Sequence, residues 1–258
     1  MNYYNEIDPY AAQWLRNLIS EQLIPGGEVD ERDIREVDPD RLRGFHQCHF
    51  FAGIGGWSYA LQLAGWPEER SVWTGSCPCQ PFSTAGKGKG TKDARHLWPA
   101  WFSLIEERCP PVIFGEQVAS KAGLEWLDIV QTDLENTGYA TGAADLCAAS
   151  VKAPHVRQRL YWLGHSDSQG LQGQGRLVGR HDPEGWKAQR RHCSATDFWS
   201  DVDRVNCWSR KIRPIKSGSF GVVNGVSGTV GRLRGFGNAI VPQVAAEFIQ
   251  AFEEARAA

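Results

Sequence analysis

The sequence predicts an α/β fold built around one sizeable domain, and three observations lead to this prediction. A chain of 258 residues is long enough to bury the core of such a domain. The apolar segment at residues 47–51 leads into a glycine-rich loop and then a helical pattern, the unit that opens nucleotide-binding α/β folds. Further apolar segments alternate with helical patterns along the chain.

Each expected element follows from local patterning. The first helix carries Trp14, Leu15, Leu18 and Ile19 at helical spacing, and the turn residues at 25–27 follow it. Short apolar segments between turn residues indicate buried strands. We therefore expect helices at residues 11–22, 57–64, 99–108, 124–136 and 242–257, and strands at 47–51, 71–74, 112–114 and 160–163.

Bulk composition excludes several classes of protein. No apolar run approaches the roughly 20 residues of a membrane span, and residues 1–10 lack a signal-peptide pattern, so we expect a soluble protein of the cytoplasm. Seven cysteines without paired spacing argue against a disulfide framework. The net charge of −2 gives no global nucleic-acid signature, although residues 176–234 are rich in arginine and lysine.

The segment Gly75-Ser76-Cys77-Pro78-Cys79-Gln80-Pro81-Phe82-Ser83 places cysteines on a turn that two prolines restrict. A thiol held on such a backbone is what a cysteine nucleophile needs. Cys77 and Cys79 with His96 also resemble half of a zinc site, but the other cysteines and histidines do not complete a set of four ligands. We therefore expect no metal.

Four more motifs accompany this one. They are Phe-Ala-Gly-Ile-Gly-Gly at 51–56, Glu-Gln-Val at 116–118, Arg-Gln-Arg at 157–159 and Gly-Asn-Ala-Ile-Val-Pro at 237–242. In this order they resemble the motifs of the DNA cytosine-5 methyltransferases, over residues 47–164 and 230–250. The resemblance implies a Rossmann-like, S-adenosylmethionine-dependent methyltransferase sheet with a small target-recognition region.

The glycine loop lets a ligand approach the backbone closely and leads into the positive end of a helix dipole. Taken alone, it suits any nucleotide-like cofactor or a tight turn. The resemblance implies S-adenosylmethionine as the cofactor, with Phe51 stacked on the adenine. The loop at Gly53, Gly55 and Gly56 would run close to the methionine moiety, and Asn238 would be a further contact.

The resemblance also assigns the chemistry. Cys79, directly after the proline and before the glutamine, would attack carbon 6 of the cytosine. Glu116, which follows an apolar strand, would act as the acid at N3; a partly desolvated carboxyl group there has a raised pKa. Arg159 would bind the cytosine O2, and Arg157 would hold the loop. The family's asparagine is Gln117 here, and its first glutamine is His155.

The order of segments differs from that of the family. Only residues 65–70 separate the helix at 57–64 from the strand that leads to Cys79, so the usual second and third strands have no room there. Residues 5–11 and 33–37 resemble the segments that are missing. We therefore expect residues 1–46 to supply those strands, with Glu6 binding the ribose hydroxyls and Asp33 the adenine amino group.

Residues 1–164 are thus expected to form the catalytic and cofactor-binding domain, 165–229 the target-recognition region, and 230–258 a segment and helix that return to the first domain. The resemblance implies a monomer acting on double-stranded DNA, in some members beside a cognate restriction enzyme or within a prophage. We expect DNA contacts from Gln80, Ser83, Lys87 and Lys89. Two alternatives stay open: a C5-pyrimidine-modifying enzyme acting on RNA, and a catalytically weak DNA-binding homologue.

Overall fold

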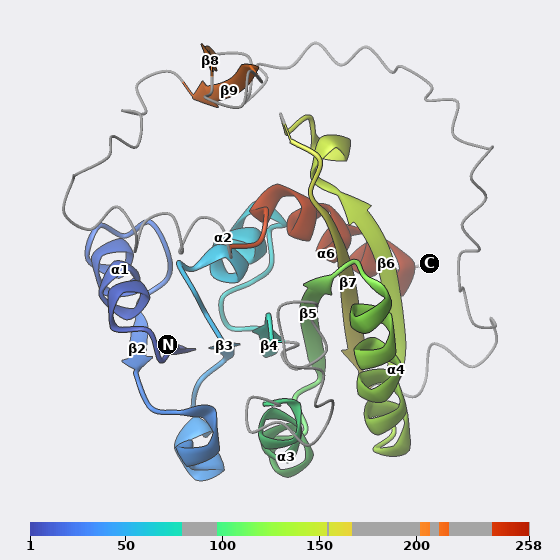
Figure 1. Ribbon diagram of the computed structural model, residues 1–258. Helices are drawn as coiled ribbons and strands as arrows, with labels where there is room; N and C mark the ends of the chain where they lie inside the picture. The colour runs from blue at the N-terminus through green and yellow to red at the C-terminus, as the bar shows by residue number, and fades with distance from the viewer. Residues whose placement is uncertain (79–96, 154, 167–201, 207–211, 217–238, 258) are drawn as a thin grey trace.

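Seven strands form one sheet, in the order β2-β1-β3-β4-β5-β7-β6 (Figure 1). The computed structural model describes residues 1–78, 97–153, 155–166, 202–206, 212–216 and 239–257. The strands from β2 to β5 are parallel, and β7 runs antiparallel to both of its neighbours. The strands of the sheet are β1 (Asn2–Asn5), β2 (Gly27–Asp30), β3 (Gln47–Phe50), β4 (Val72–Gly75), β5 (Val112–Val118), β6 (Ala140–Cys147) and β7 (Gln158–His165). The α/β prediction is confirmed.

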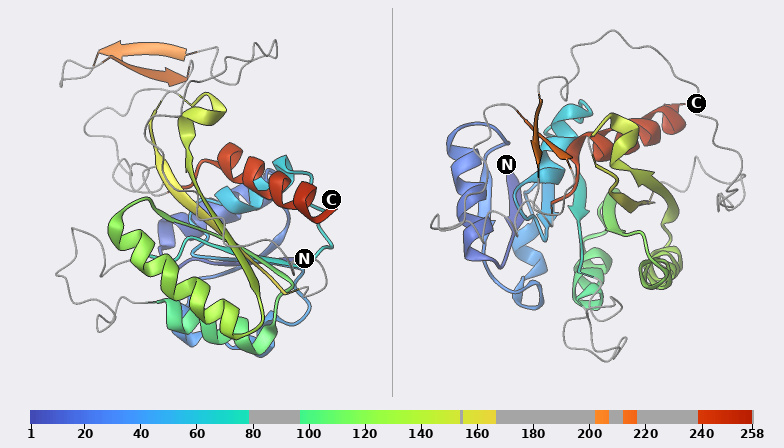
Figure 2. Two further views of the ribbon diagram at one scale, coloured as in Figure 1. Left: turned by 90° about the vertical axis from the view of Figure 1, so that its right-hand side faces the viewer. Right: turned by 45° about the horizontal axis from the view of Figure 1, so that its top comes forward.

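Helices cover both faces of this sheet, as Figure 2 shows for α4 and α6. One face carries α1 (Pro9–Ser20), α2 (Gly56–Leu63) and α6 (Pro242–Ala257). The other carries α3 (Trp98–Arg108), α4 (Lys121–Asn136) and the short 3-10 helices η1 (Ile34–Glu36) and η2 (Pro39–Leu42). A further 3-10 helix, η4 (Ala148–Val151), follows β6, and β8 (Val202–Asn206) pairs with β9 (Ile212–Lys216) in a separate antiparallel sheet. No helix of the described residues is long and apolar enough to cross a bilayer.

Large aromatic side chains fill the core on the α3 and α4 face. Trp98, Trp101, Trp126 and Trp162 are all almost fully buried. The rings of Trp98 and Trp101 meet edge to face, with centroids 5.7 Å apart. Such pairs add to the stabilisation that burial of their area already provides. These four tryptophans therefore pack the core.

The chain forms two outer strands before it forms the central strand that precedes the glycine loop. β1 pairs in parallel with β3, with Asn2 opposite Gln47 and Asn5 opposite Phe50, and β2 pairs with β1 on the far side. The first two strands in sequence therefore flank β3 on the side away from β4. Residues 1–46 thus supply two parallel strands of this sheet, and their replacement of the family's usual second and third strands stays a prediction.

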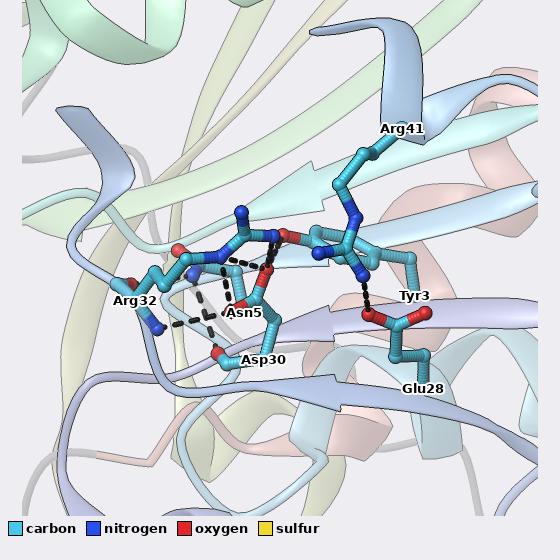
Figure 3. Close-up of polar contacts among 6 residues, drawn as sticks. All are labelled: Tyr3, Asn5, Glu28, Asp30, Arg32 and Arg41. Carbon is cyan, nitrogen blue, oxygen red and sulfur yellow. Dashed lines mark hydrogen bonds and ion pairs between the residues drawn. The ribbon is translucent and has the colours of Figure 1, made fainter. Parts of the chain in front are cut away.

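A buried carboxylate stabilises this outer pair of strands (Figure 3). The Tyr3 hydroxyl donates to Asp30 over 2.7 Å, and Arg32 binds both oxygens of the same carboxylate. Burial favours the neutral acid, but these bonds overcome it and hold the pKa of Asp30 at about 2. Beside this cluster, Arg41 forms an ion pair with Glu28.

Several element boundaries differ from the prediction, and each has a local cause. The first helix begins at Pro9 because Asp8 caps it, accepting from the Tyr10 and Ala11 amides. The fourth begins at Lys121 because Ser120 caps the Gly123 amide. The fifth strand does not end at Phe114 but continues to Val118, since β7 pairs with it along residues 115–118.

Candidate active site

A cavity of about 260 Å³ lies where β1, β3 and β4 end. Ligands of open α/β sheets bind at the carboxyl ends of the strands. The walls of the cavity come from the segment after β1, the start of η1, the glycine loop, the segment after β4 and the residues before α6. Those most relevant to function are Glu6, Asp33, Phe51, Gly53, Gly56, Trp57, Ser76, Pro78 and Ile240.

The glycine loop turns sharply into α2. Gly55 precedes this helix with φ at +82°, a conformation that glycine adopts without strain. A side chain at Gly56 would come within 2.8 Å of Ile240, so the loop also needs glycine for close packing. No side chain caps α2, whose first residue, Gly56, borders the cavity. The helix therefore presents its positive end to a bound ligand.

Phe51 enters this loop with φ at +51°, which is uncommon for an aromatic residue. Its ring borders the cavity and packs edge to face against Trp101, with centroids 5.8 Å apart. Backbone strain of this kind persists where the surrounding structure holds it in place, often at ligand sites. The exposed part of the ring is available to a flat ligand.

Glu6 lies at the end of β1 and reaches across to the glycine loop. Its Oε2 accepts a hydrogen bond from the Gly53 amide over 2.7 Å, and its Oε1 accepts one from the Asp8 amide over 2.9 Å. Burial raises the pKa of Glu6, and the two amide bonds act in the opposite direction. The carboxylate thus borders the cavity in a fixed orientation, with lone pairs left for a ligand.

Asp33 also borders the cavity, at the start of η1. It accepts from the Arg35 amide over 3.0 Å and forms an ion pair with the Arg35 guanidinium. This partner holds the pKa of Asp33 at about 2, so the group is ionised at neutral pH.

Glu116 and Arg159 form an ion pair, with the Arg159 Nε 2.8 Å from Glu116 Oε1. The glutamate is only 6% exposed and lies within β5, opposite Tyr161 of β7. Its position inside the strand corrects the prediction that it follows the strand. Burial raises the pKa of Glu116, while Arg159, Arg157 and the Ser76 hydroxyl act in the opposite direction.

The backbone that leads to Cys79 is held from the neighbouring strand. The Gln117 amide nitrogen donates to the Cys77 carbonyl over 3.1 Å, and its oxygen accepts from the Val118 amide over 2.8 Å. Pro78 borders the cavity. The glutamine that replaces the family's asparagine therefore connects β5 to the residues just before Cys79. Six predicted site residues lie outside the described part of the chain: Cys79, Gln80, Ser83, Lys87, Lys89 and Asn238.

A wider groove of about 990 Å³ lies beside the cavity. Arg157, Arg159 and His155 contribute polar groups to it, and Gly55 and Gly56 belong to its wall. Burial lowers the pKa of Arg157, and the neighbouring Arg159 adds to that effect. Within the described residues, no group of three or more histidine, cysteine, aspartate or glutamate side chains is arranged to hold a metal ion.

The sequence pattern of the C-5 cytosine-specific DNA methylase family matches residues 2–197. The chain belongs to this family. The match begins in the N-terminal segment, so that segment is part of what the chain shares with the C-5 cytosine-specific DNA methylases. Homologues in this family use S-adenosylmethionine as the methyl donor.

Two relatives within the C-5 cytosine-specific DNA methylases illustrate the similarity. The Type II methyltransferase M.HhaI of Haemophilus parahaemolyticus is 26% identical over 167 residues, which cover 50% of this chain and 51% of that protein. M.PspPI of Psychrobacter sp. is 32% identical over 165 residues, covering 62% of this chain and 33% of the relative. The matches thus span about half of M.HhaI and a third of M.PspPI.

A solved methyltransferase structure from Entamoeba histolytica, EhMeth, is also similar to this C-5 cytosine-specific DNA methylase chain. The TM-score is 0.43 at 15% sequence identity, over 64% of this chain and 44% of that one.

Two site residues were not predicted from the sequence, although one lies in a family motif and the other directly after one. Ser76 stands three residues before Cys79, and Trp57 follows the glycine loop directly. In the structure both border the cavity, and the Trp57 indole nitrogen donates to the Ser76 oxygen over 3.2 Å. Only the packing of α2 against the end of β4 brings them together, and no spacing rule connects positions 57 and 76.

Proposed function

We propose that this chain transfers a methyl group from S-adenosylmethionine to carbon 5 of a cytosine in duplex DNA. The observation that carries the proposal is the buried Glu116–Arg159 pair. It lies next to the backbone that leads to Cys79, because Gln117, the residue after Glu116, holds the Cys77 carbonyl. We infer that this acid and this fixed cation act together with Cys79, beside the cavity that the glycine loop borders.

The side chains of the cavity fit S-adenosylmethionine. Glu6 can accept hydrogen bonds from the ribose hydroxyls, and the ionised Asp33 can accept one from the adenine amino group. The exposed part of the Phe51 ring offers a stacking surface for adenine. We propose that Asn238 adds a further contact. When bound, the cofactor supplies an electrophilic methyl group on a sulfonium.

Cys79 provides the activation that a cytosine ring needs. Carbon 5 of cytosine is a poor nucleophile, and addition of a thiolate at carbon 6 converts the base into an enamine-like species that can attack the methyl group. After transfer, a base removes the proton from carbon 5, and elimination of the thiolate restores the ring and frees Cys79. Pro78, the residue before Cys79, borders the cavity, and we propose that Cys79 acts there.

Glu116 and Arg159 would stabilise the changing charge of the ring. The raised pKa of Glu116 lets its carboxyl group hold a proton at a higher pH than an ordinary glutamate, which suits donation to N3 as the thiolate adds. Arg159 is always protonated and can donate to the cytosine O2. Arg157 would hold the loop that precedes β7.

The groove beside the cavity is our proposed route for DNA, because Arg157 and Arg159 give it positive charge. A cytosine inside a duplex must leave the stack to reach Cys79. Gln80, Ser83, Lys87 and Lys89 would contact the DNA, and residues 165–229 would select the sequence. We further propose that the chain acts as a monomer and, as one of a restriction-modification pair, beside a cognate restriction enzyme.

Methyl transfer from labelled S-adenosylmethionine to duplex DNA and to RNA of the same sequence tests the proposal. We expect incorporation into DNA alone, and none with Cys79→Ser or Glu116→Gln. Incorporation into RNA alone would replace the proposal with the RNA-modifying alternative. Binding of DNA without transfer, under conditions where the cofactor binds, would favour a catalytically weak homologue.

A further inference from the structure

The register of the sheet brings Ser76 next to Glu116. Gly75, the last residue of β4, pairs with Gly115 of β5, so the residues that follow them stand side by side. Ser76 is half-buried and borders the cofactor cavity, while Glu116 is buried. A short hydroxyl side chain that borders the cavity therefore lies beside the acid.

Trp57 fixes the orientation of this hydroxyl group. The Trp57 indole nitrogen lies 3.2 Å from the Ser76 oxygen. An indole N–H can only donate, so the serine oxygen is the acceptor of this bond and its own proton remains to be donated. The acidic side chain beside it in the register of β4 and β5 is Glu116, whose pKa the Ser76 hydroxyl lowers.

We propose that Ser76 is a positioning residue, oriented by Trp57, that donates a hydrogen bond to Glu116 and aims its carboxyl group at the target base. The inference deepens the proposed function and rests on it, because it assumes that Glu116 is the acid. Trp57 and Ser76 both border the cofactor cavity, so the same contacts connect the acid to the helix that begins at the glycine loop.

The effect of Ser76 on the pKa of Glu116 can be distinguished from the effects of the charged groups around Glu116. The titratable and charged groups that face it in the described residues are Arg157, Arg159 and Tyr161, all on β7 or just before it. Ser76 is the neutral donor on the β4 side. Its bond favours the ionised carboxylate, so its loss would raise the pKa of Glu116 further.

The test measures single-turnover methyl transfer against pH for wild type, Ser76→Ala, Ser76→Gly and Ser76→Thr. A general acid is active while protonated, so the rate falls as the pH rises through its pKa. Without the serine donor, the alkaline limb of the pH profile should move up by about one pH unit. The rate at neutral pH should fall roughly tenfold, because the Glu116 carboxyl group is no longer held in its orientation. Ser76→Thr, which keeps the hydroxyl group, should restore the limb. Trp57→Phe should shift it in the same direction by a smaller amount.

Two controls distinguish a loss of positioning from a loss of folding or of cofactor binding. Circular dichroism and the dissociation constant for S-adenosylmethionine show whether each variant is folded and loaded, and Ser76→Gly replaces Ser76→Ala if the latter does not fold. An unmoved alkaline limb in the folded alanine or glycine variant, with Glu116→Gln inactive, overturns this inference alone. Full transfer by Glu116→Gln instead contradicts the proposed function.

Discussion

The Glu6 carboxylate accepts a hydrogen bond from the Gly53 amide over 2.7 Å, although the two residues are 47 positions apart. This bond connects the N-terminal segment to the glycine loop across neighbouring parallel strands, β1 and β3. Two segments far apart in the sequence therefore form one wall of the cavity. The position of a strand in the sheet, and not its place in the sequence, decides what it contributes to the site.

Replacing Glu6 with alanine should weaken S-adenosylmethionine binding about 10- to 100-fold, because a charged acceptor is lost and the loop loses an anchor. Isothermal titration measures the dissociation constant, and Glu21→Ala, at the exposed end of α1, is the matched control. Since burial raises the pKa of Glu6, affinity should begin to fall at a higher pH than for an ordinary glutamate as the solution is acidified. An unchanged constant for Glu6→Ala would remove Glu6 from the site.

Gln117→Ala should lower the rate of methyl transfer roughly tenfold and leave affinity for S-adenosylmethionine unchanged, because the Cys77 carbonyl loses its anchor while the cavity is untouched. Steady-state kinetics separate the two effects. Gln131→Ala, which removes a glutamine bond to Thr141 elsewhere on the fold, serves as the comparison. Equal rates for the two variants would show that the Gln117 bond has no part in positioning Cys79.

Asp30 should make the stability of the fold sensitive to acid. Its pKa is about 2 in the fold, against an ordinary value of 3.8, so its contribution is fully present above about pH 4 and is lost as the pH falls toward 2. The difference corresponds to about 2 kcal/mol.

Asp30→Asn should therefore unfold at lower urea concentration at pH 7 and lose less stability on acidification. Asp40→Asn is the control, because Asp40 is 72% exposed and its ion pair with Arg43 should contribute little. Parallel pH dependence of wild type and Asp30→Asn would contradict this assignment.

Gly115→Ala should destabilise the fold by about 1–3 kcal/mol or more, since a side chain there would meet Trp162 at 2.1 Å within the packed core. Gly142→Ala is the matched control on the edge strand β6, where the nearest atom, of Leu163, lies 3.7 Å away. Urea unfolding compares the two. Similar midpoints would mean that the Trp162 ring can move aside.

The sequence predicted those parts of the molecule that local patterning determines. The apolar run before the glycine loop identified β3, and the proline and cysteine pattern identified the segment after β4. By contrast, β6 was not predicted, because residues 140–147 are rich in alanine and contain no valine or isoleucine, so their strand propensity is weak. Pairing with β7 along its whole length stabilises β6 as a strand despite this weak propensity.

In the candidate active site, too, local motifs were predictable and tertiary contacts were not. The motifs named Glu116 and Arg159 separately, and the antiparallel pairing of β5 with β7 explains why they form an ion pair. The Ser76 and Trp57 contact depends on how α2 packs at the end of β4, which no sequence interval encodes. Residue types were therefore predictable, but the partner of each side chain came from the tertiary structure.

Bisulfite sequencing of DNA from cells that express the chain tests the central claim most directly, with Cys79→Ser expressed beside the wild type. We expect new 5-methylcytosine within a short recognition sequence for the wild type and none for Cys79→Ser. Absence of new 5-methylcytosine in wild-type cells that contain the folded protein, or equal methylation by Cys79→Ser, would contradict it.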